Sequence, residues 1–196
     1  MCLIRFFKGL FGKKQTQETP VATAGSYAKS YKVETFIFGK LPTSLAEFQA
    51  MPEAKLDNPY RTAAMTMVAL CAYAQNKQAG VDMLNYLRGP RPMSPMDIQF
   101  MDDRFRGEGK KIPFSYFEGA NPGNNYKPTE PMSIQIREQA HSFDTDGYAR
   151  FDLRSGGADS PRQIVLRKKE SSGEWFLWEQ QVMVGIKPAK EDDPWA

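Results

Sequence analysis

The chain has 196 residues, of which 41% are hydrophobic and 25% charged, a balance typical of a folded domain and not of a disordered or fibrous protein. This length suits one domain with a tail, or two small domains. The formal net charge of +3 comes from the first twenty residues, which hold four basic side chains against Glu18. The remaining 176 residues carry 22 basic and 22 acidic side chains, which argues against a basic nucleic-acid-binding domain.

The N-terminal segment has apolar and basic residues at helical spacing. Its apolar residues recur on one face of a helix, and its basic residues lie around the rest. Burial of apolar surface is favourable by about 25 cal/mol per Å², and an anionic membrane surface would satisfy both sets of side chains. We therefore expect peripheral membrane binding through Leu3, Phe7, Lys8, Leu10, Phe11, Lys13 and Lys14. Docking on the protein's own body or on a partner protein, and a disordered tail, are the alternatives.

No apolar run reaches the roughly 20 residues that a transmembrane helix needs. The longest charge-free run of the body, residues 62–76, is short and partly polar. The N-terminus also lacks the apolar core and cleavage site of a secretory signal. These patterns predict a cytoplasmic protein with peripheral attachment at the inner face of the membrane. Cys2 and Cys71 do not make a disulfide framework, and Cys71 is expected to be a small buried side chain.

The composition changes at about residue 30. Residues 1–29 are predicted to be a basic amphipathic tail and linker, and residues 30–196 a single domain, because the second half of the tail is small, polar and aperiodic. Capping residues predict helices that begin after Ser44, Asn58 and Ser94. A further helix is predicted over about 77–88, where Gly89 and Pro90 end it. The helix that follows Asn58 has apolar residues nearly all round. It is expected to be the central core helix, with Met67 and Val68 buried.

The second half of the domain has the two-residue period of β-strands. A first strand is predicted at 31–38, and four more at 132–136, 149–153, 163–168 and 175–180. The last two flank the turn 169–174, which is a hairpin signal. Residues 112–131, rich in proline and glycine, are predicted to form an irregular loop. The order of elements predicts an α+β domain in which N-terminal helices pack on a C-terminal antiparallel sheet.

Four distinctive motifs are SGGADSP at 155–161, LRKK at 166–169, GEWFLWEQ at 173–180 and DDPWA at 192–196. By these motifs, most of the chain resembles an uncharacterised bacterial protein family of unknown function. This resemblance implies neither an activity nor catalytic residues. The order of helices and final hairpin is also similar in topology to NTF2-like domains, in which a curved sheet forms a cone around a helix and leaves a pocket. An SH3-like barrel after a helical segment is the alternative.

Two short segments have the composition of ion sites. Residues 155–162 could form an anion nest from backbone N–H groups, so Gly156, Gly157 and Arg162 are candidate ligand-binding residues. The alternative is a tight connection whose glycines adopt positive φ.

The run Asp144 to Gly147 suggests calcium, but the twelfth position of an EF-hand loop would be a serine and not a glutamate. A turn between strands is therefore predicted there.

Basic and aromatic residues lie close together in the C-terminal hairpin. Residues 162–169 hold four basic side chains, and Trp175, Phe176 and Trp178 follow on the next strand, a combination found in platforms that bind single-stranded nucleic acid. Strand alternation places Phe176 and Trp178 on one face and Trp175 on the other, so at least one of these faces must be core. This pattern and the balanced charge of the body therefore argue against nucleic acid as a partner.

No constellation of residues predicts a reaction. His141 is the only histidine, so neither a zinc site nor a His-dependent hydrolase is indicated, and no metal or cofactor is expected. The expected function is a non-enzymatic binding domain that takes a protein segment or small ligand. Its cavity would lie between helix 58–75 and the sheet, near the loop 112–131. The alternative is a small enzyme of unknown reaction that uses the same cavity.

The C-terminal end is acidic and aromatic. Glu191, Asp192 and Asp193 precede Trp195, whose large apolar area favours burial. Trp195 is expected to pack back onto the body as part of an ordered strap. A peptide ligand for another protein is the alternative.

Overall fold

The computed structural model describes residues 31–195, which form one compact unit. The candidate membrane-binding residues from Leu3 to Lys14 lie outside the described residues, so the N-terminal helix stays a prediction. The helices and strands, in chain order, are β1 (Val33–Phe38), α1 (Leu45–Ala50), α2 (Pro59–Gln75), α3 (Lys77–Arg88), α4 (Pro95–Arg104), β2 (Met132–Arg137), β3 (Tyr148–Leu153), β4 (Arg162–Lys168) and β5 (Trp175–Gln180). Short 3-10 helices span Pro52–Lys55, Gly107–Tyr116, Pro122–Asn124 and Lys190–Asp192.

The strands form one antiparallel sheet in the order β1-β2-β3-β4-β5, so each strand lies beside its neighbours in sequence. The β1/β2, β3/β4 and β4/β5 ladders run along their strands, whereas β2 and β3 share the single pair Arg137–Asp152. The sheet therefore divides into a two-stranded and a three-stranded part joined at this pair. Its inner face is fully covered, as the burial of Ile134, Ile136, Phe151, Leu153, Ile164 and Leu166 shows.

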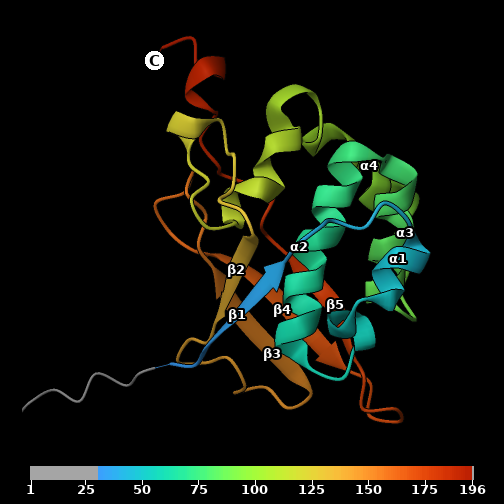
Figure 1. Cartoon of the computed structure of the whole chain (residues 1–196). Coiled ribbons are helices and arrows are strands. Elements are labelled where there is room, and N and C mark those ends of the chain that lie inside the picture. The colour runs from blue at the N-terminus through green and yellow to red at the C-terminus, as the bar shows by residue number, and fades with distance from the viewer. Residues whose placement is uncertain (1–30, 196) are drawn as a thin grey trace, which may run out of the picture. The chain divides into compact units, whose positions relative to one another are not determined.

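The helix α2 lies at the centre of the domain. Asn58 caps it by accepting hydrogen bonds from its first N–H groups, and Pro59 at the first position sacrifices no helical hydrogen bond. The residues from Ala63 to Cys71 are completely buried, because α2 contacts all five strands and also α3. Figure 1 shows α2 across the sheet, with α1, α3 and α4 beyond it. The prediction of a central core helix is confirmed.

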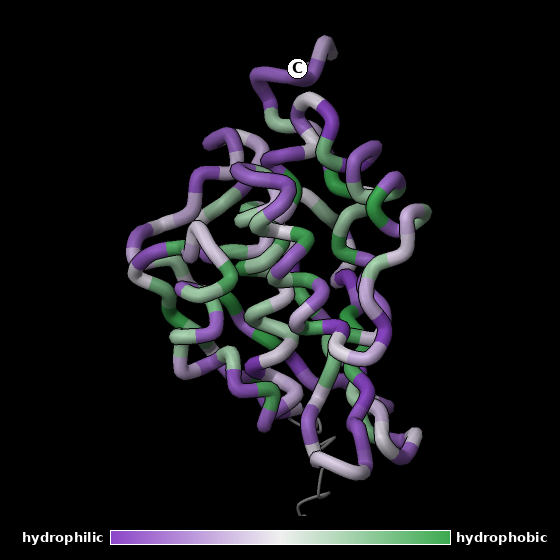
Figure 2. Tube along the Cα trace, turned by 90° about the vertical axis from the view of Figure 1, so that its right-hand side faces the viewer, coloured by the Kyte–Doolittle hydropathy of each residue, from purple (hydrophilic) through white to green (hydrophobic). Residues whose placement is uncertain are grey.

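The helix α3 approaches α2 at a glycine. A Cβ atom at Gly80 would lie 2.3 Å from the Cα atom of Tyr73, so only glycine permits this distance between the two backbones. A turn at Gly89, with φ +53°, follows α3, and a capping box formed by Ser94 and Asp97 begins α4. Figure 2 shows hydrophobic residues gathered in the interior and hydrophilic residues along the outer turns.

The predicted α+β class is confirmed, and the strands of the second half lie within two residues of their predicted bounds. The strand β1 joins the same sheet at its edge. The stretch 112–131 is not wholly irregular, because the 3-10 helix Gly107–Tyr116 occupies its start. This 3-10 helix spans ten residues and contains Pro113, although 3-10 helices are usually only about three or four residues long.

The expectation that Trp195 packs onto the body is wrong. Trp195 is 93% exposed, and its backbone N–H donates to the Asp193 carboxylate at 2.9 Å. The segment before it is anchored by charge instead: Lys111 Nζ lies 3.0 Å from Glu191 Oε1 and 2.6 Å from Asp192 Oδ2. These ion pairs hold the chain by its acidic residues, so the tryptophan is not needed to fasten it.

Truncation of a buried methionine tests the central position of α2. We expect Met67→Ala to lower the free energy of unfolding by about 2–5 kcal/mol, because the side chain is fully buried and its removal leaves a cavity. The matched control is Met96→Ala at a side chain that is 80% exposed, with an expected change within about 0.5 kcal/mol. Urea unfolding measures both. Equal effects at the two positions would contradict the assigned core.

Substitution of Gly80 tests the close approach of α3 to α2. Alanine in a helix is ordinarily about 1 kcal/mol more favourable than glycine, but at Gly80 the added Cβ overlaps the Tyr73 backbone. We therefore expect Gly80→Ala to destabilise the domain by about 1–3 kcal/mol. Gly39→Ala is the control, since a Cβ there meets no atom within 4 Å. A Gly80→Ala variant as stable as the Gly39→Ala variant would refute the close approach.

Candidate functional site

A cluster of arginine and aromatic side chains lies where the β4–β5 hairpin meets the end of α3. The guanidinium carbons of Arg91 and Arg167 lie 4.0 and 4.6 Å from the centre of the Trp178 ring. Tyr148 meets Trp178 edge to face, with ring centres 6.0 Å apart. Arg167 also lies 5.4 Å from the Tyr148 ring. Contacts of this kind orient a guanidinium through its face and leave the N–H groups on its edge for acceptors.

The position of Trp178 results from a β-bulge. Leu166 pairs with Leu177 and Val165 pairs with Glu179, so Trp178 has no partner across the ladder. An extra residue of this kind redirects the side chains of the bulged strand. Leu177 consequently remains in the core, whereas the three aromatic residues of β5 are each half-buried. The simple alternation predicted for β5 does not hold across the bulge.

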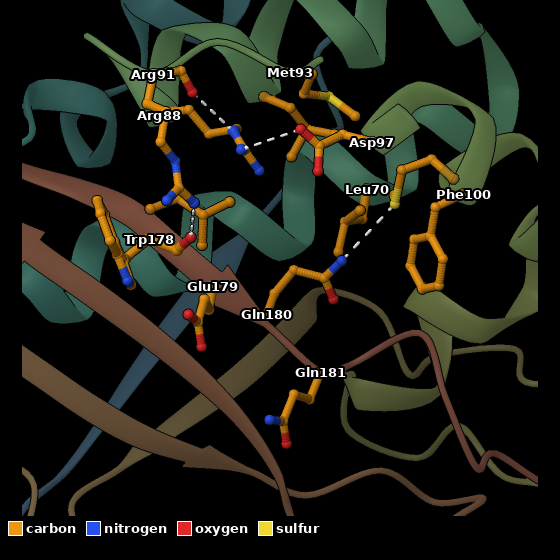
Figure 3. A pocket seen from close by; sticks show the side chains of 13 residues that line it. Leu70, Arg88, Arg91, Met93, Asp97, Phe100, Trp178, Glu179, Gln180 and Gln181 are labelled. Carbon is orange, nitrogen blue, oxygen red and sulfur yellow. Dashed lines mark hydrogen bonds and ion pairs between the residues drawn. The ribbon is translucent and has the colours of Figure 1, made fainter. Parts of the chain in front are cut away.

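The chain at the end of α3 supplies Arg88 and Arg91. Figure 3 shows Arg91 reaching β5, where its Nη2 donates to the carbonyl of Trp178 at 2.7 Å. Arg88 donates to the Arg91 carbonyl at 3.0 Å and lies 3.4 Å from Asp97 Oδ2. Burial lowers the pKa of Arg88. Burial also acts to raise the pKa of Asp97, but hydrogen bonds from Ser94 and the charge of Arg88 hold that pKa below its usual value.

Two adjoining pockets surround this cluster and share Arg88, Arg91, Leu177 and Trp178; we call the joined surface the Trp178 groove. Its larger part has a volume of about 630 Å³, within the range of ligand-binding pockets. That part is lined by cationic and aromatic side chains, which include Tyr148, Arg167, Lys168, Lys169 and Phe176. The smaller part, about 230 Å³, is lined by the apolar residues Leu70, Leu84, Met93, Phe100 and Met101 and by the polar residues Asp97, Glu179, Gln180 and Gln181.

The larger part of the groove has an excess of positive charge. Five cationic side chains line it, against the carboxylates of Asp146 and Glu170. Within the part of the chain that the structure describes, Arg167 makes no hydrogen bond or ion pair through its side chain, and aromatic rings are its partners. Its guanidinium edge can therefore bind a carboxylate or phosphate in a bidentate manner.

The groove does not coincide with the cavity expected between α2 and the sheet. That interface is occupied by completely buried side chains of α2 and the strands. Leu70 is the residue of α2 that lines the Trp178 groove. A third pocket borders the 112–131 segment, but it lies between β2 and the end of β3. The expected position of the cavity is therefore corrected to the β5 side of the domain.

The glycines of the predicted anion nest have structural contacts. The Gly156 N–H donates to the carbonyl of Ser115 at 2.8 Å, and the Gly157 N–H donates to Ser155 Oγ at 3.0 Å. A Cβ atom at Gly156 would lie 1.9 Å from the carbonyl oxygen of Ala120. Glycine is therefore required here by the close approach of another backbone segment.

Arg162, the third predicted ligand-binding residue, fastens the C-terminal segment. Its Nε and Nη2 donate to the carbonyls of Val184 and Gly185 at 2.9 and 2.7 Å, and its Nη1 donates to Ser160. These backbone contacts occupy the guanidinium. Ligand binding by Gly156, Gly157 and Arg162 stays a prediction.

Other reactive groups lie away from the groove. Cys71 is buried, and burial raises the pKa of its thiol well above the usual value, which disfavours the reactive thiolate. His141 is exposed, with its Nδ1 2.5 Å from Asp144 Oδ2, in the segment before β3. Among the described residues, no three His, Cys, Asp or Glu side chains are grouped as metal ligands.

Sequence reasoning identified one part of the cluster and missed another. The basic run that contains Arg167 and the aromatic Trp178 were both noted as neighbours in the hairpin. Arg91 and Tyr148 were not, because they come from the end of α3 and the start of β3. The pairing of Tyr148 with Arg167 across the β3/β4 ladder is the signal that a correct strand register would have supplied.

Comparisons place the chain in a family without relating it to a characterised protein. No helix among the described residues is long and apolar enough to cross a membrane. No curated protein and no solved structure matches the chain. One protein family matches residues 40–190, a span that includes the whole Trp178 groove. The chain therefore belongs to the family described as Domain of unknown function (DUF6935).

Proposed function

We propose that this domain is a non-enzymatic binding module that recognises an acidic protein segment carrying a bulky apolar side chain. The observation that carries the proposal is the contact of both Arg91 and Arg167 with the Trp178 ring, where a cationic pocket joins an apolar one. The ring holds the two guanidinium groups in place. Because the two arginine side chains are already ordered, the protein loses less conformational entropy when a ligand binds, which favours affinity.

The cationic part of the groove supports recognition of acidic side chains. Arg91 already donates to the Trp178 carbonyl and Arg88 lies near Asp97, so these two arginines are partly satisfied. Arg167, Lys168 and Lys169 are exposed and supply the charge that a ligand would meet. Charge complementarity of this kind accelerates association and sets specificity more than it adds affinity.

The apolar part of the groove supports recognition of a large side chain. Met93, Phe100 and Leu177 lie on its lining, and methionine and aromatic residues adapt to differently shaped partners. A volume of about 230 Å³ suits one side chain and not a complete small ligand. An extended peptide can place an acidic residue in one part and an apolar residue in the other, which is why a protein segment is preferred as the ligand.

Attachment of the domain to a membrane is a second part of the proposal, and it is supported by the sequence of the first fourteen residues. An amphipathic basic helix gains from apolar burial and from about 1 kcal/mol per basic residue near anionic lipid. The segment 15–29 would then serve as a flexible linker. The groove could in that case engage partners at the membrane surface.

A peptide panel tests the groove. Labelled 12-residue peptides would be acidic and apolar, acidic alone, apolar alone, or basic and apolar, and fluorescence polarisation would measure their binding. We expect the acidic and apolar peptides to bind best and to weaken at higher salt. Arg167→Gln should reduce their affinity by about five- to tenfold, because an ionic hydrogen bond is lost.

The control for this experiment is Arg154→Gln. Arg154 is also exposed and also has no side-chain hydrogen bond or ion pair within the described residues, but it lines the third pocket. Its substitution should leave unchanged the advantage of the acidic and apolar peptides over the peptides that are acidic alone, which Arg167→Gln should reduce. Equal losses in both variants, or equal binding of basic and acidic peptides, would contradict the proposed function.

Vesicle sedimentation tests membrane attachment. The full chain should sediment with vesicles that contain anionic lipid, and binding should fall with salt and by at least about tenfold in Phe7→Glu, because the apolar face then carries a charge. Ile37→Glu is the matched control, since Ile37 is an exposed apolar residue of the body. Sedimentation that survives deletion of residues 1–14 would rule out the anchor.

A further inference from the structure

A second site lies in the division between the two parts of the sheet. Beyond the Arg137–Asp152 pair, β2 and β3 are not joined, and the segment 115–120 fills part of the space. The Glu118 N–H donates to the Ser133 carbonyl at 2.9 Å, so this segment takes the place of a neighbouring strand beside β2. A pocket of about 430 Å³ remains, lined mainly by polar residues that include Ser133, Gln135, Arg137, Arg154 and Glu118.

The guanidinium of Arg137 is incompletely satisfied at this pocket. Its Nη2 donates to Gln135 Oε1 at 2.6 Å, but its buried Nε has no hydrogen-bond partner. Asp152 is its partner across the ladder, yet the two side chains form no ion pair in the described part of the chain. A buried N–H group without an acceptor costs about 1–3 kcal/mol, and native proteins seldom retain one without a reason such as a bound ion.

The charges that face Arg137 favour an anion. Arg154 is exposed on the same pocket and has no side-chain partner within the described residues. Asp152, the partner of Arg137 across the ladder, is not among the residues that line the pocket. Burial raises the pKa of Asp152 above its usual value, and a hydrogen bond with Gln163 acts to lower it. Glu118 is exposed and is the carboxylate among the lining residues. Two guanidinium groups thus face one carboxylate.

We propose that the division between β2 and β3 is a binding site for a small oxyanion, a phosphate or carboxylate group, held between Arg137 and Arg154. Guanidinium groups bind such anions through paired N–H···O bonds. The hydroxyl of Ser133 and the amide of Gln135 line the same pocket and can donate further hydrogen bonds to the anion. The site is separate from the Trp178 groove, with which it shares no lining residue.

Titration calorimetry on the full chain with inorganic phosphate and with succinate, at matched ionic strength, tests this site. At least one probe should bind saturably with a dissociation constant of about 1 mM or lower, and the tighter probe identifies the phosphate or carboxylate chemistry. Arg137→Gln and Arg154→Gln should each weaken binding by about tenfold or more. Glu118→Gln should tighten binding by about two- to fivefold, because a repulsive charge is removed.

The variant Arg167→Gln separates this site from the groove: the binding that Arg154→Gln weakens should persist in Arg167→Gln, whereas any binding of the probes in the groove should be weakened there. Arg154→Gln keeps the test valid if Arg137→Gln fails to fold, because Arg154 is exposed. The proposal is overturned if neither probe binds with a dissociation constant of about 1 mM or lower. It is also overturned if the Arg154 variant retains full affinity, or if Arg167→Gln abolishes binding instead. The last outcome would move the anion to the groove and leave the proposed function intact.

Discussion

The burial of α2 against all five strands is the constraint on which the remaining structure depends. A helix whose side chains are covered on every side must be enclosed by the sheet on one side and by other helices on the other. The small residue Gly80 brings α3 close to α2, and α3 in turn contacts β5. This arrangement fixes where α3 ends, and hence where Arg88 and Arg91 reach the sheet.

Both candidate sites lie where regular strand pairing fails. In β5, the bulge leaves Trp178 without a partner and brings it beside Arg91 and Arg167. Between β2 and β3, pairing stops after one residue pair and a polar pocket remains. A complete ladder satisfies its own backbone groups and leaves flat surfaces, whereas an interruption exposes polar groups and creates concavity. The two candidate sites therefore coincide with the two irregularities of the sheet.

The neutral net charge of the body does not make its surface neutral everywhere. Along the sequence the body is neutral, which argued against an electrostatic role. In the fold, acidic side chains are engaged elsewhere: Asp102 pairs with Lys77, and Glu191 and Asp192 pair with Lys111. Arg167 and Arg154 remain without such partners among the described residues. A neutral domain can therefore present local positive surfaces, because the fold gathers cationic side chains in the groove while these acidic residues lie in other segments.

The sequence by itself determined the elements: Asn58 and Ser94 as caps, the all-round apolar pattern of α2, the period of the strands, and so the α+β class. These signals are local, since capping and side-chain periodicity depend on residues a few positions apart. The tertiary structure alone decided which residues meet. Arg91 and Tyr148 join Trp178 through packing of α3 and strand register. Arg137 lies at the one pair that joins β2 to β3 and its Nε lacks an acceptor, and Trp195 is exposed while Lys111 pairs with the acidic residues before it. Each of these outcomes depends on contacts between residues distant in sequence, which no local pattern encodes.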